Sequence, residues 1–256
     1  MHDVLCPIMG DLAGVRERMN RFYKIRAGDI KEFARLEKHL DKYICPAVVL
    51  YAARIYGKVT DKVISLAAVF QLIYQAMMVH YDINEDVQIR ESTFADPRDG
   101  CQYPVLVGDY LYGRFFTTLC DADIVKYLGL LSEIICMINE GGIKKIKSQA
   151  GGTANPTVRR EIVRLEFAGL MAECCRLGGE EASAGGEQQQ RLSKFGSALG
   201  MALGMAENQW FDQAEKYFKE ALKLLDTLTP GLDRDNLKSL VLHMRVRSAE
   251  SRKMVC

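Results

Sequence analysis

The segment that decides the fold is the apolar run LAAVFQLIYQAMMVH, residues 66–80. It lies inside a longer stretch, 60–85, that contains neither proline nor glycine and is apolar on nearly all sides until its last turn. A helix of that composition is expected at the buried centre of a protein. Because Gln71 and Gln75 interrupt the run, and because it is shorter than a membrane span, we expect no integral membrane segment.

The sequence on both sides of this central helix also predicts helices. Only six prolines occur in 256 residues, and apolar residues recur at helical spacing. Residues 1–41 are expected to form two short N-terminal helices, with Gly28 ending the first and Asp29 capping the second. Further helices are expected over 46–57, 105–119, 122–140, 157–177, 191–228 and 233–252. The fold class is therefore all-α, an antiparallel helical bundle.

The whole chain, 1–256, is expected to form a single domain, because it contains no repeat of fixed period and no second compositional unit. The stretch 178–190 has few apolar residues and is predicted to be a mobile, solvated loop. Glycines at 196, 200 and 204 lie four residues apart on one helical face. That spacing would let a neighbouring helix approach closely.

Charge and cysteine content exclude several classes of protein. The formal net charge is +1, so no field over the whole surface would recruit nucleic acid. The eight cysteines are scattered without a C-x-x-C pair, which indicates reduced thiols acting as small apolar residues rather than a zinc site or a disulfide framework. These features together predict a cytoplasmic location.

The end of the central helix carries the first candidate site. Asp82, Glu85 and Asp86 follow one another at i, i+3 and i+4, so their carboxylates share one helical face. Clustered carboxylates suit Mg²⁺, which usually takes one or two of them together with substrate phosphate. A solvated acidic turn at the end of a helix is also common, and the spacing alone favours that simpler interpretation.

Asp109 is a second candidate. It lies in Gly108-Asp109-Tyr110, which is expected to open a helix, where Asp109 would serve either as a cap or as part of a polar pocket. The sequence contains no phosphate-binding glycine loop, zinc-binding histidine pair or nucleophile elbow. Residue types and spacing alone therefore predict a helical bundle with one acidic helix end, and they identify no function.

Four segments, taken in order, resemble the trans-isoprenyl diphosphate synthase (polyprenyl synthetase) family. The run 66–80 is similar to the family helix that leads into its first aspartate-rich motif. The segments GDYL (108–111) and FGSALGMA (195–202) resemble the opening of a later helix and the run before the second aspartate-rich motif. Residues 214–247 are similar to the closing helix pair. The resemblance extends over nearly the whole chain.

The resemblance implies the isoprenoid synthase fold, a helical bundle around a central cavity. In this family two acidic motifs face each other across the cavity and hold Mg²⁺ on the diphosphate of an allylic substrate. Ionisation of that substrate gives a carbocation, which isopentenyl diphosphate attacks. The metal ions neutralise the leaving diphosphate, and apolar walls exclude water.

The acidic motifs of this chain depart from the family pattern. The first motif, D-D-x-x-D in the family, has the sequence YDINE at 81–85, which leaves Asp82 and Glu85, with Asp86 following. The second motif would fall at ENQWF, 207–211, where Glu207 is the single acid. A residual Mg²⁺ site is accordingly expected to be weak, and no cofactor is assigned.

The residues expected to contact diphosphate also differ from the family pattern. Of the family's basic residues before the central helix and after the first motif, Lys42 and Arg90 remain. The Lys-Thr pair that contacts diphosphate corresponds to Glu166-Phe167, which reverses the charge. The Phe-Gln pair before the second motif corresponds to Leu203-Gly204. Each lost charge-assisted contact is worth roughly 1.5–3 kcal/mol, so substrate affinity should be low.

Three functions follow from this pattern. The leading hypothesis is a non-catalytic, regulatory or structural subunit of a heteromeric polyprenyl diphosphate synthase in isoprenoid biosynthesis. The first alternative is an active prenyltransferase with a remodelled Mg²⁺ site that uses Asp82, Glu85, Asp86 and Asp109 for metal and Lys42 and Arg90 for phosphate. The second is an apolar binding protein for prenyl lipids. A prenyl diphosphate is the ligand expected if the cavity still binds one.

The resemblance also implies a protein partner, either a second copy or a catalytic prenyl diphosphate synthase subunit. The family dimerises through the helices after the first motif. The apolar candidates there could equally belong to the intramolecular core. They are Leu106, Tyr110, Phe115, Phe116, Ile134 and Met137.

Overall fold

The computed structural model describes residues 2–25, 28–29, 43–81, 99–150 and 155–255. Within these residues the secondary structure is helical except for one antiparallel pair of two-residue strands. Buried apolar side chains from Leu5 near the N-terminus to Met244 near the C-terminus form the core. The all-α prediction is confirmed, whereas the extent of the domain stays a prediction.

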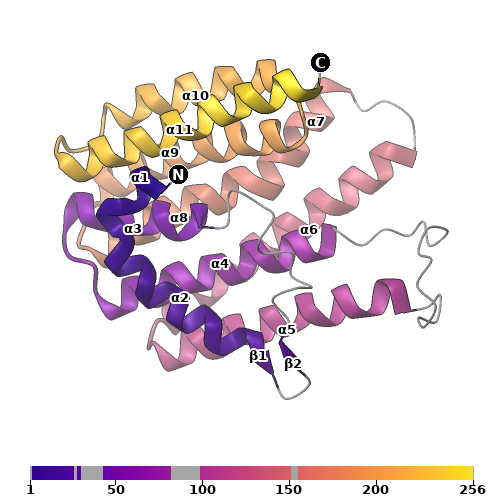
Figure 1. Ribbon diagram of the computed structural model, residues 1–256, viewed down its shortest axis with the longest axis horizontal. Coiled ribbons are helices and arrows are strands. Elements are labelled where there is room, and N and C mark those ends of the chain that lie inside the picture. The colour runs from indigo at the N-terminus through magenta and orange to yellow at the C-terminus, as the bar shows by residue number, and fades with distance from the viewer. Residues whose placement is uncertain (1, 26–27, 30–42, 82–98, 151–154, 256) are drawn as a thin grey trace.

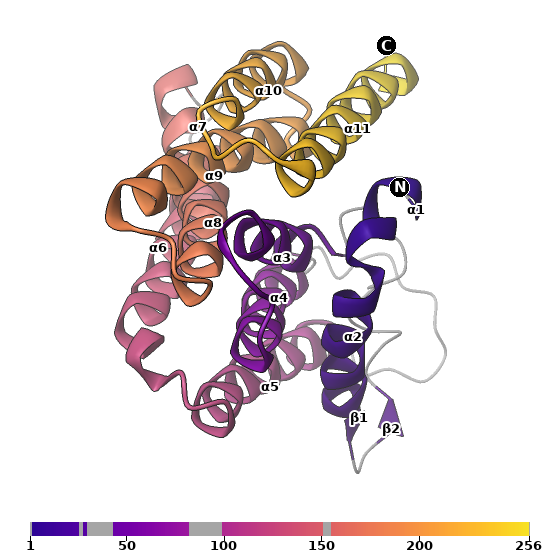
Figure 2. The same cartoon turned by 90° about the vertical axis from the view of Figure 1, so that its left-hand side faces the viewer.

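The predicted central helix is α4 (Asp61–Tyr81), and every residue from 65 to 77 is buried. α3 (Ile44–Tyr56) packs beside it, and Figure 2 shows the two helices at the middle of the bundle. α4 is long and apolar enough to cross a membrane, but 83% of its most apolar window is buried inside the protein. That is the behaviour of a core helix in a folded domain.

The remaining helices surround this pair (Figures 1 and 2). Those packed directly against α3 or α4 are α2 (Met9–Tyr23), α5 (Asp99–Asp121), α6 (Leu128–Ala150), α8 (Gly169–Glu181) and α11 (Leu232–Val255). α9 (Gly186–Glu207) packs against α8, and α10 (Phe211–Leu225) packs against α9. Shorter pieces complete the chain: α1 (His2–Leu5), η1 (Cys6–Ile8), η2 (Val125–Tyr127), α7 (Pro156–Val163) and the π-helical turn η3 (Arg164–Ala168).

The N-terminal segment differs in part from the expectation for 1–41. The first predicted helix is present as α2, but it ends at Tyr23 rather than at Gly28. The chain then forms strands β1 (Lys24–Ile25) and β2 (Gly28–Asp29). Asp29 pairs with Lys24 in a strand, and its predicted role as a helix cap stays a prediction. The second predicted helix lies outside the described residues.

The prediction of a mobile loop over 178–190 is wrong. α8 continues to Glu181 and α9 begins at Gly186, so only 182–185 connect the two helices. The glycine at 178 reflects close packing, because a Cβ at that position would lie 2.5 Å from the Val49 carbonyl oxygen. The few apolar residues from 186 to 190 reflect the exposed start of a helix, where Gln188 Oε1 accepts from the Gly185 amide at 2.7 Å.

The two glutamines that interrupt α4 have different environments. Gln75 accepts a hydrogen bond from the Tyr23 hydroxyl of α2 at 2.7 Å, which joins these helices inside the core. Burial is the main reason that the pKa of Tyr23 is raised, although the bond to Gln75 lowers it. The Gln71 amide is also buried, yet it has no hydrogen-bond partner among the described residues. A buried amide of this kind costs about 1–3 kcal/mol.

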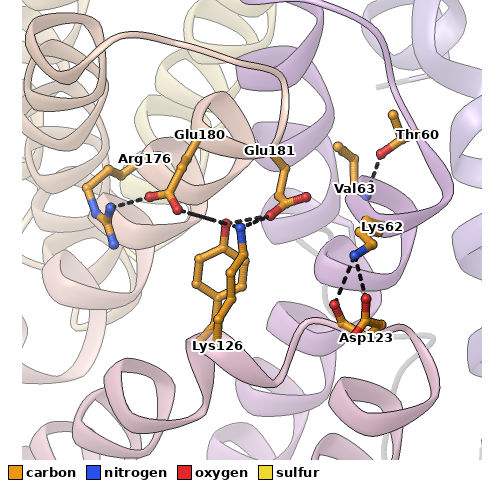
Figure 3. Close-up of polar contacts among 9 residues, drawn as sticks. Thr60, Lys62, Val63, Asp123, Lys126, Arg176, Glu180 and Glu181 are labelled. Atoms are coloured by element: carbon orange, nitrogen blue, oxygen red, sulfur yellow. Dashed lines mark hydrogen bonds and ion pairs between the residues drawn. The ribbon is translucent and has the colours of Figure 1, made fainter.

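A polar cluster joins the C-terminal end of α8 to η2, and Figure 3 shows Glu180 and Glu181 directed toward Lys126. The Tyr127 hydroxyl lies 2.6 Å from Glu181 Oε1 and 2.9 Å from Glu180 Oε1. Lys126 Nζ lies 2.7 Å from Glu181 Oε1, and Arg176 Nη1 lies 2.8 Å from Glu180 Oε2. We call these five residues the α8 clasp. It fixes the end of α8 to the start of α6.

Glu181 is the least exposed acid of the α8 clasp, with 8% of its side chain accessible. Burial alone would raise the pKa of Glu181, but hydrogen bonds from Lys126 and Tyr127 outweigh burial and hold the pKa below its ordinary value of 4.5. The ionised carboxylate therefore stabilises the fold at pH values above the ordinary pKa of 4.5. This stabilisation is lost as the pH falls through the lowered pKa.

We expect Glu181→Gln to lower the free energy of unfolding at pH 7 by about 1.5–3 kcal/mol, because charge-assisted hydrogen bonds are lost. The difference from the wild type should narrow as the pH falls below 4.5. Urea denaturation at several pH values measures the loss of stability at pH 7 and its decrease at low pH. Glu187→Gln, at an exposed ion pair on α9, is the control and should change stability by less than about 0.5 kcal/mol. A deficit that stays constant with pH would contradict the prediction.

Candidate functional site

The first acidic motif follows the end of α4, and the structure describes its approach. α4 ends at Tyr81, so Asp82, Glu85, Asp86 and Arg90 lie outside the described residues, as does Lys42 before α3. Among the described residues no three acidic, histidine or cysteine side chains are grouped to hold a metal ion. Because the acids of the first motif are not among these residues, the weak Mg²⁺ site stays a prediction.

The last turn of α4 packs against α5 through His80. A Cβ at Gly108 would lie only 2.0 Å from His80 Nε2, so a larger residue would require the imidazole to move. Asp109 follows, with its Oδ1 4.0 Å from His80 Nε2 and two thirds of its side chain exposed. Asp109 is inside α5, ten residues from its start, and the alternative of a helix cap is wrong. It is a carboxylate beside the end of α4.

The second acidic motif falls where α9 ends. The predicted helix 191–228 is divided here, since α9 stops at Glu207 and α10 starts at Phe211. Gln209 has a φ of 62°, in the left-handed region, and the Trp210 amide bonds to the Met205 carbonyl at 2.8 Å. The sequence ENQWF therefore forms a tight turn that closes the helix. Apolar residues recur at helical spacing on both sides of this turn, so the sequence did not predict that the helix ends here.

Glu207 lines a pocket of about 120 Å³ between α9, α10 and α11. Four of the other lining residues belong to α11: Met244, Arg247, Ser248 and Ser251. The remnant of the second motif thus contributes to a polar pocket formed with the closing helix pair.

Glu166 and Phe167 lie in the π-helical turn η3, between α7 and α8. Glu166 is completely buried, and a Cβ at Gly141 of α6 would lie 2.7 Å from Glu166 Cγ. A carboxylate removed from water in this way cannot serve as an open contact for a second anion. π-Helical turns occur often at functional sites. The sequence gave no signal of this one.

Close packing between α9 and the segment formed by η3 and α8 depends on three glycines. A Cβ would lie 2.3 Å from the Met171 carbonyl oxygen at Gly196 and 2.5 Å from the Phe167 carbonyl oxygen at Gly200. At Gly204 it would lie 2.6 Å from Phe167 Cδ2, in the aromatic ring, and 2.6 Å from Val163 Cγ1. The close helix approach predicted from the glycine spacing is confirmed.

Comparisons with known proteins agree on the fold. The structure of a decaprenyl diphosphate synthase from Rhodobacter capsulatus superposes with a TM-score of 0.82 at 20% identity, over 97% of this chain and 99% of that chain. The structure of a polyprenyl synthase from Caulobacter crescentus CB15, complexed with calcium and isoprenyl diphosphate, gives a TM-score of 0.78 at 22% identity. It covers 93% of this chain and 96% of that chain.

Sequence comparison gives relatives of similarly low identity. Heptaprenyl diphosphate synthase component 2 of Geobacillus stearothermophilus is 26% identical over 200 residues, which are 77% of this chain and 62% of that protein. Octaprenyl diphosphate synthase of Escherichia coli (strain K12) is 24% identical over 168 residues, 65% of this chain and 52% of that protein. The chain thus spans less than two thirds of the length of these two relatives.

The helical bundle has the all-α isoprenoid synthase fold. The sequence model described as polyprenyl synthetase matches residues 34–206, two thirds of the chain. The chain belongs to this family, the trans-isoprenyl diphosphate synthases, which are transferases of isoprenoid biosynthesis. The family resemblance seen in the sequence is confirmed.

We expect Gly204→Ala to destabilise the protein by about 1–3 kcal/mol, because the added methyl group would overlap the Phe167 ring and Val163. The loss should be smaller in a Phe167→Leu background, where the ring is absent. Urea denaturation of the two single variants and the double variant measures this coupling. Gly186→Ala is the control on the same helix, since a Cβ there meets nothing within 4 Å. Additive effects of the two substitutions would contradict the contact.

Proposed function

We propose that this chain is a non-catalytic subunit, regulatory or structural, of a heteromeric polyprenyl diphosphate synthase in the cytoplasm. The observation that carries the proposal is the contact between Phe167 and Gly204. By the family resemblance, Phe167 replaces the threonine of a diphosphate-binding Lys-Thr pair, and Gly204 replaces the glutamine of a Phe-Gln pair. A small residue has become large and a larger one small at a single packing contact.

This pairing of substitutions supports a remodelled wall rather than a site with one missing group. Neither a phenyl ring nor a carboxylate supplies a cation or a hydroxyl to a diphosphate, and both side chains are buried, Phe167 at 4% exposure and Glu166 completely. Volume-conserving exchanges in a core are tolerated with little loss of stability. The fold is retained, while the groups that would grip the substrate are replaced by packing.

The acidic side of the site supports the same proposal. Glu207 is the single acid of the second motif, and it lines a pocket with residues of α10 and α11. A metal cluster that bridges two motifs needs carboxylates from both walls. With Asp82, Glu85 and Asp86 on one wall and Glu207 alone on the other, a bridging cluster would lack ligands.

A partner subunit fits the exposed apolar side chains of α5 and α6. Leu106 and Phe116 of α5 are 64% and 48% exposed, and Ile143 and Ile146 of α6 are 54% and 68% exposed. Large exposed apolar side chains of this kind are a feature of interaction surfaces. α5 also lies at the edge of the bundle opposite α10 and α11 (Figures 1 and 2). We propose that a catalytic prenyl diphosphate synthase subunit binds this α5–α6 face.

The six interface candidates from the sequence separate into two groups. Leu106 and Phe116 are exposed, whereas Phe115 and Ile134 are core residues. Tyr110 is half-buried and its hydroxyl donates to the Phe22 carbonyl at 2.8 Å. Met137 is half-buried too, and a Cβ at Gly169 would lie 3.4 Å from its Cε. The exposed isoleucines 143 and 146 were not among the candidates.

The purified chain alone is expected to give no turnover with isopentenyl diphosphate, an allylic diphosphate and Mg²⁺. Co-expressed with an intact prenyl diphosphate synthase of the same genome, it should co-purify and change the activity or product length of that enzyme. Radiolabelled product analysis measures both. Condensation by the chain alone would establish the active-enzyme alternative and overturn the proposal. Thermal stabilisation by prenyl alcohols and prenyl diphosphates alike would instead indicate a lipid-binding protein.

Leu106→Ser combined with Phe116→Ser should weaken association with the partner by at least tenfold, because apolar anchors at the centre of an interface dominate its affinity. The matched control is Leu242→Ser with Val246→Ser, two exposed apolar residues of α11. The control pair should associate as the wild type does. Co-elution and light scattering provide the measurement. Equal loss in both pairs, or in neither, would place the partner elsewhere.

A further inference from the structure

A pocket of about 230 Å³ lies between α2, α4 and α5, and it plays no part in the function proposed above. It is lined by side chains from all three helices and by the residue that follows α5. They are Arg18, Arg21, Phe22, Asp61, Ser65, Arg114, Thr118, Asp121 and Ala122. Three arginines in so small a volume repel one another unless anions compensate them. The ion pairs of each arginine therefore show which of the three charges is not compensated.

Two of the three arginines have carboxylate partners. Arg18 pairs with Asp61 across α2 and α4, and Arg21 pairs with Glu17 within α2. Arg114 has no ion pair among the residues that the structure describes. Its guanidinium lies over the Phe22 ring, with Cζ 4.4 Å from the ring centroid. Its Nε is buried without a hydrogen-bond acceptor in the described part of the chain.

Neither aspartate of the pocket forms an ion pair with Arg114. Asp61 is engaged by Arg18, and Asp121 is an exposed residue at the last position of α5. A guanidinium supplies only donors, and leaving a buried donor without an acceptor costs free energy. The arrangement is thus complementary to a ligand that brings acceptor oxygens and negative charge.

Ser65 adds a buried hydroxyl donor to this set, and Thr118 adds a buried hydroxyl whose hydrogen is already used within α5. Ser65 of α4 is 3% exposed and Thr118 of α5 is 6% exposed, and both line the pocket. The Thr118 hydroxyl donates to the Arg114 carbonyl at 2.7 Å, which fixes its position one turn from Arg114. Planar guanidinium groups combined with hydroxyls suit the oxygens of phosphate. The volume is below that of pockets for larger organic ligands, which begin at about 300 Å³.

The pocket is separate from the family's diphosphate site. Ser65 lies in the second turn of α4, and that helix reaches the first acidic motif only after Tyr81. At 1.5 Å per residue the two positions are about 24 Å apart along the helix. Arg114 lies nearer that end, six residues or about 9 Å along α5 from Gly108, which packs against His80.

We propose that this pocket is a binding site for a small oxyanion of the phosphate class, with Arg114 as the principal contact and Arg18, Ser65 and Thr118 around it. Inorganic phosphate and inorganic diphosphate share the required chemistry. Because the residues come from three helices, an anion bound here would hold α2 against α4 and α5.

Isothermal titration calorimetry of the full chain with phosphate, and separately with diphosphate, tests the proposal. Titrations are run at low ionic strength with a chelator present, so that no metal-dependent site contributes. We expect one anion per chain, with affinity reduced about tenfold or more in Arg114→Gln because a charge-assisted contact is lost. Arg160→Gln, at an exposed position of α7, changes net charge equally and should bind as the wild type does.

Circular dichroism of Arg114→Gln verifies that the variant is folded, and Arg114→Lys should retain part of the affinity through its charge. No binding of either anion to the wild type would overturn the proposal. Equal binding by the wild type and Arg114→Gln would overturn it as well. Loss of partner association in Arg114→Gln without anion binding would instead assign Arg114 to a carboxylate of the partner subunit.

Discussion

The close approach of α9 to η3 and α8 is the constraint on which the rest of the structure depends. Backbone atoms of these helices come so near that Gly196 and Gly200 have no room for a methyl group. Once α9 is fixed in this way, its end at Glu207 and the turn into α10 are fixed with it. The same contact determines the position of Phe167 against Gly204. One packing arrangement thus underlies both the fold and the wall that we propose is remodelled.

Sequence periodicity was sufficient for the fold where burial follows composition. α4 was predictable because every side of it is apolar, and the glycine contacts of α9 were predictable because their spacing equals one helical turn. The loop over 178–190 was a wrong prediction for a related reason. Glycine and polar residues lower the apolar content equally in a mobile loop and in a closely packed helix end, and only tertiary contacts such as Gly178 on Val49 distinguish them.

The sites were less predictable because they depend on relations between distant segments. Asp109 could be named from the family pattern, but its place in the middle of α5 depends on a helix start at Asp99 that capping signals did not mark. The π-helical turn has no signature in its residues, although it carries the buried Glu166. Arg18 and Arg114 lie 96 residues apart in the chain, so no local spacing could bring them into one pocket.

The depth of α4 has a consequence for synthesis of the protein. α4 is translated well before α8, which packs over α3 and α4 only after residue 169 has been made. Until then the nascent chain carries a long apolar helix without its cover, a state open to aggregation and to recognition by chaperones. Gln71 and Gln75 then have a role of their own, since two amides within the segment disfavour its transfer into a lipid bilayer.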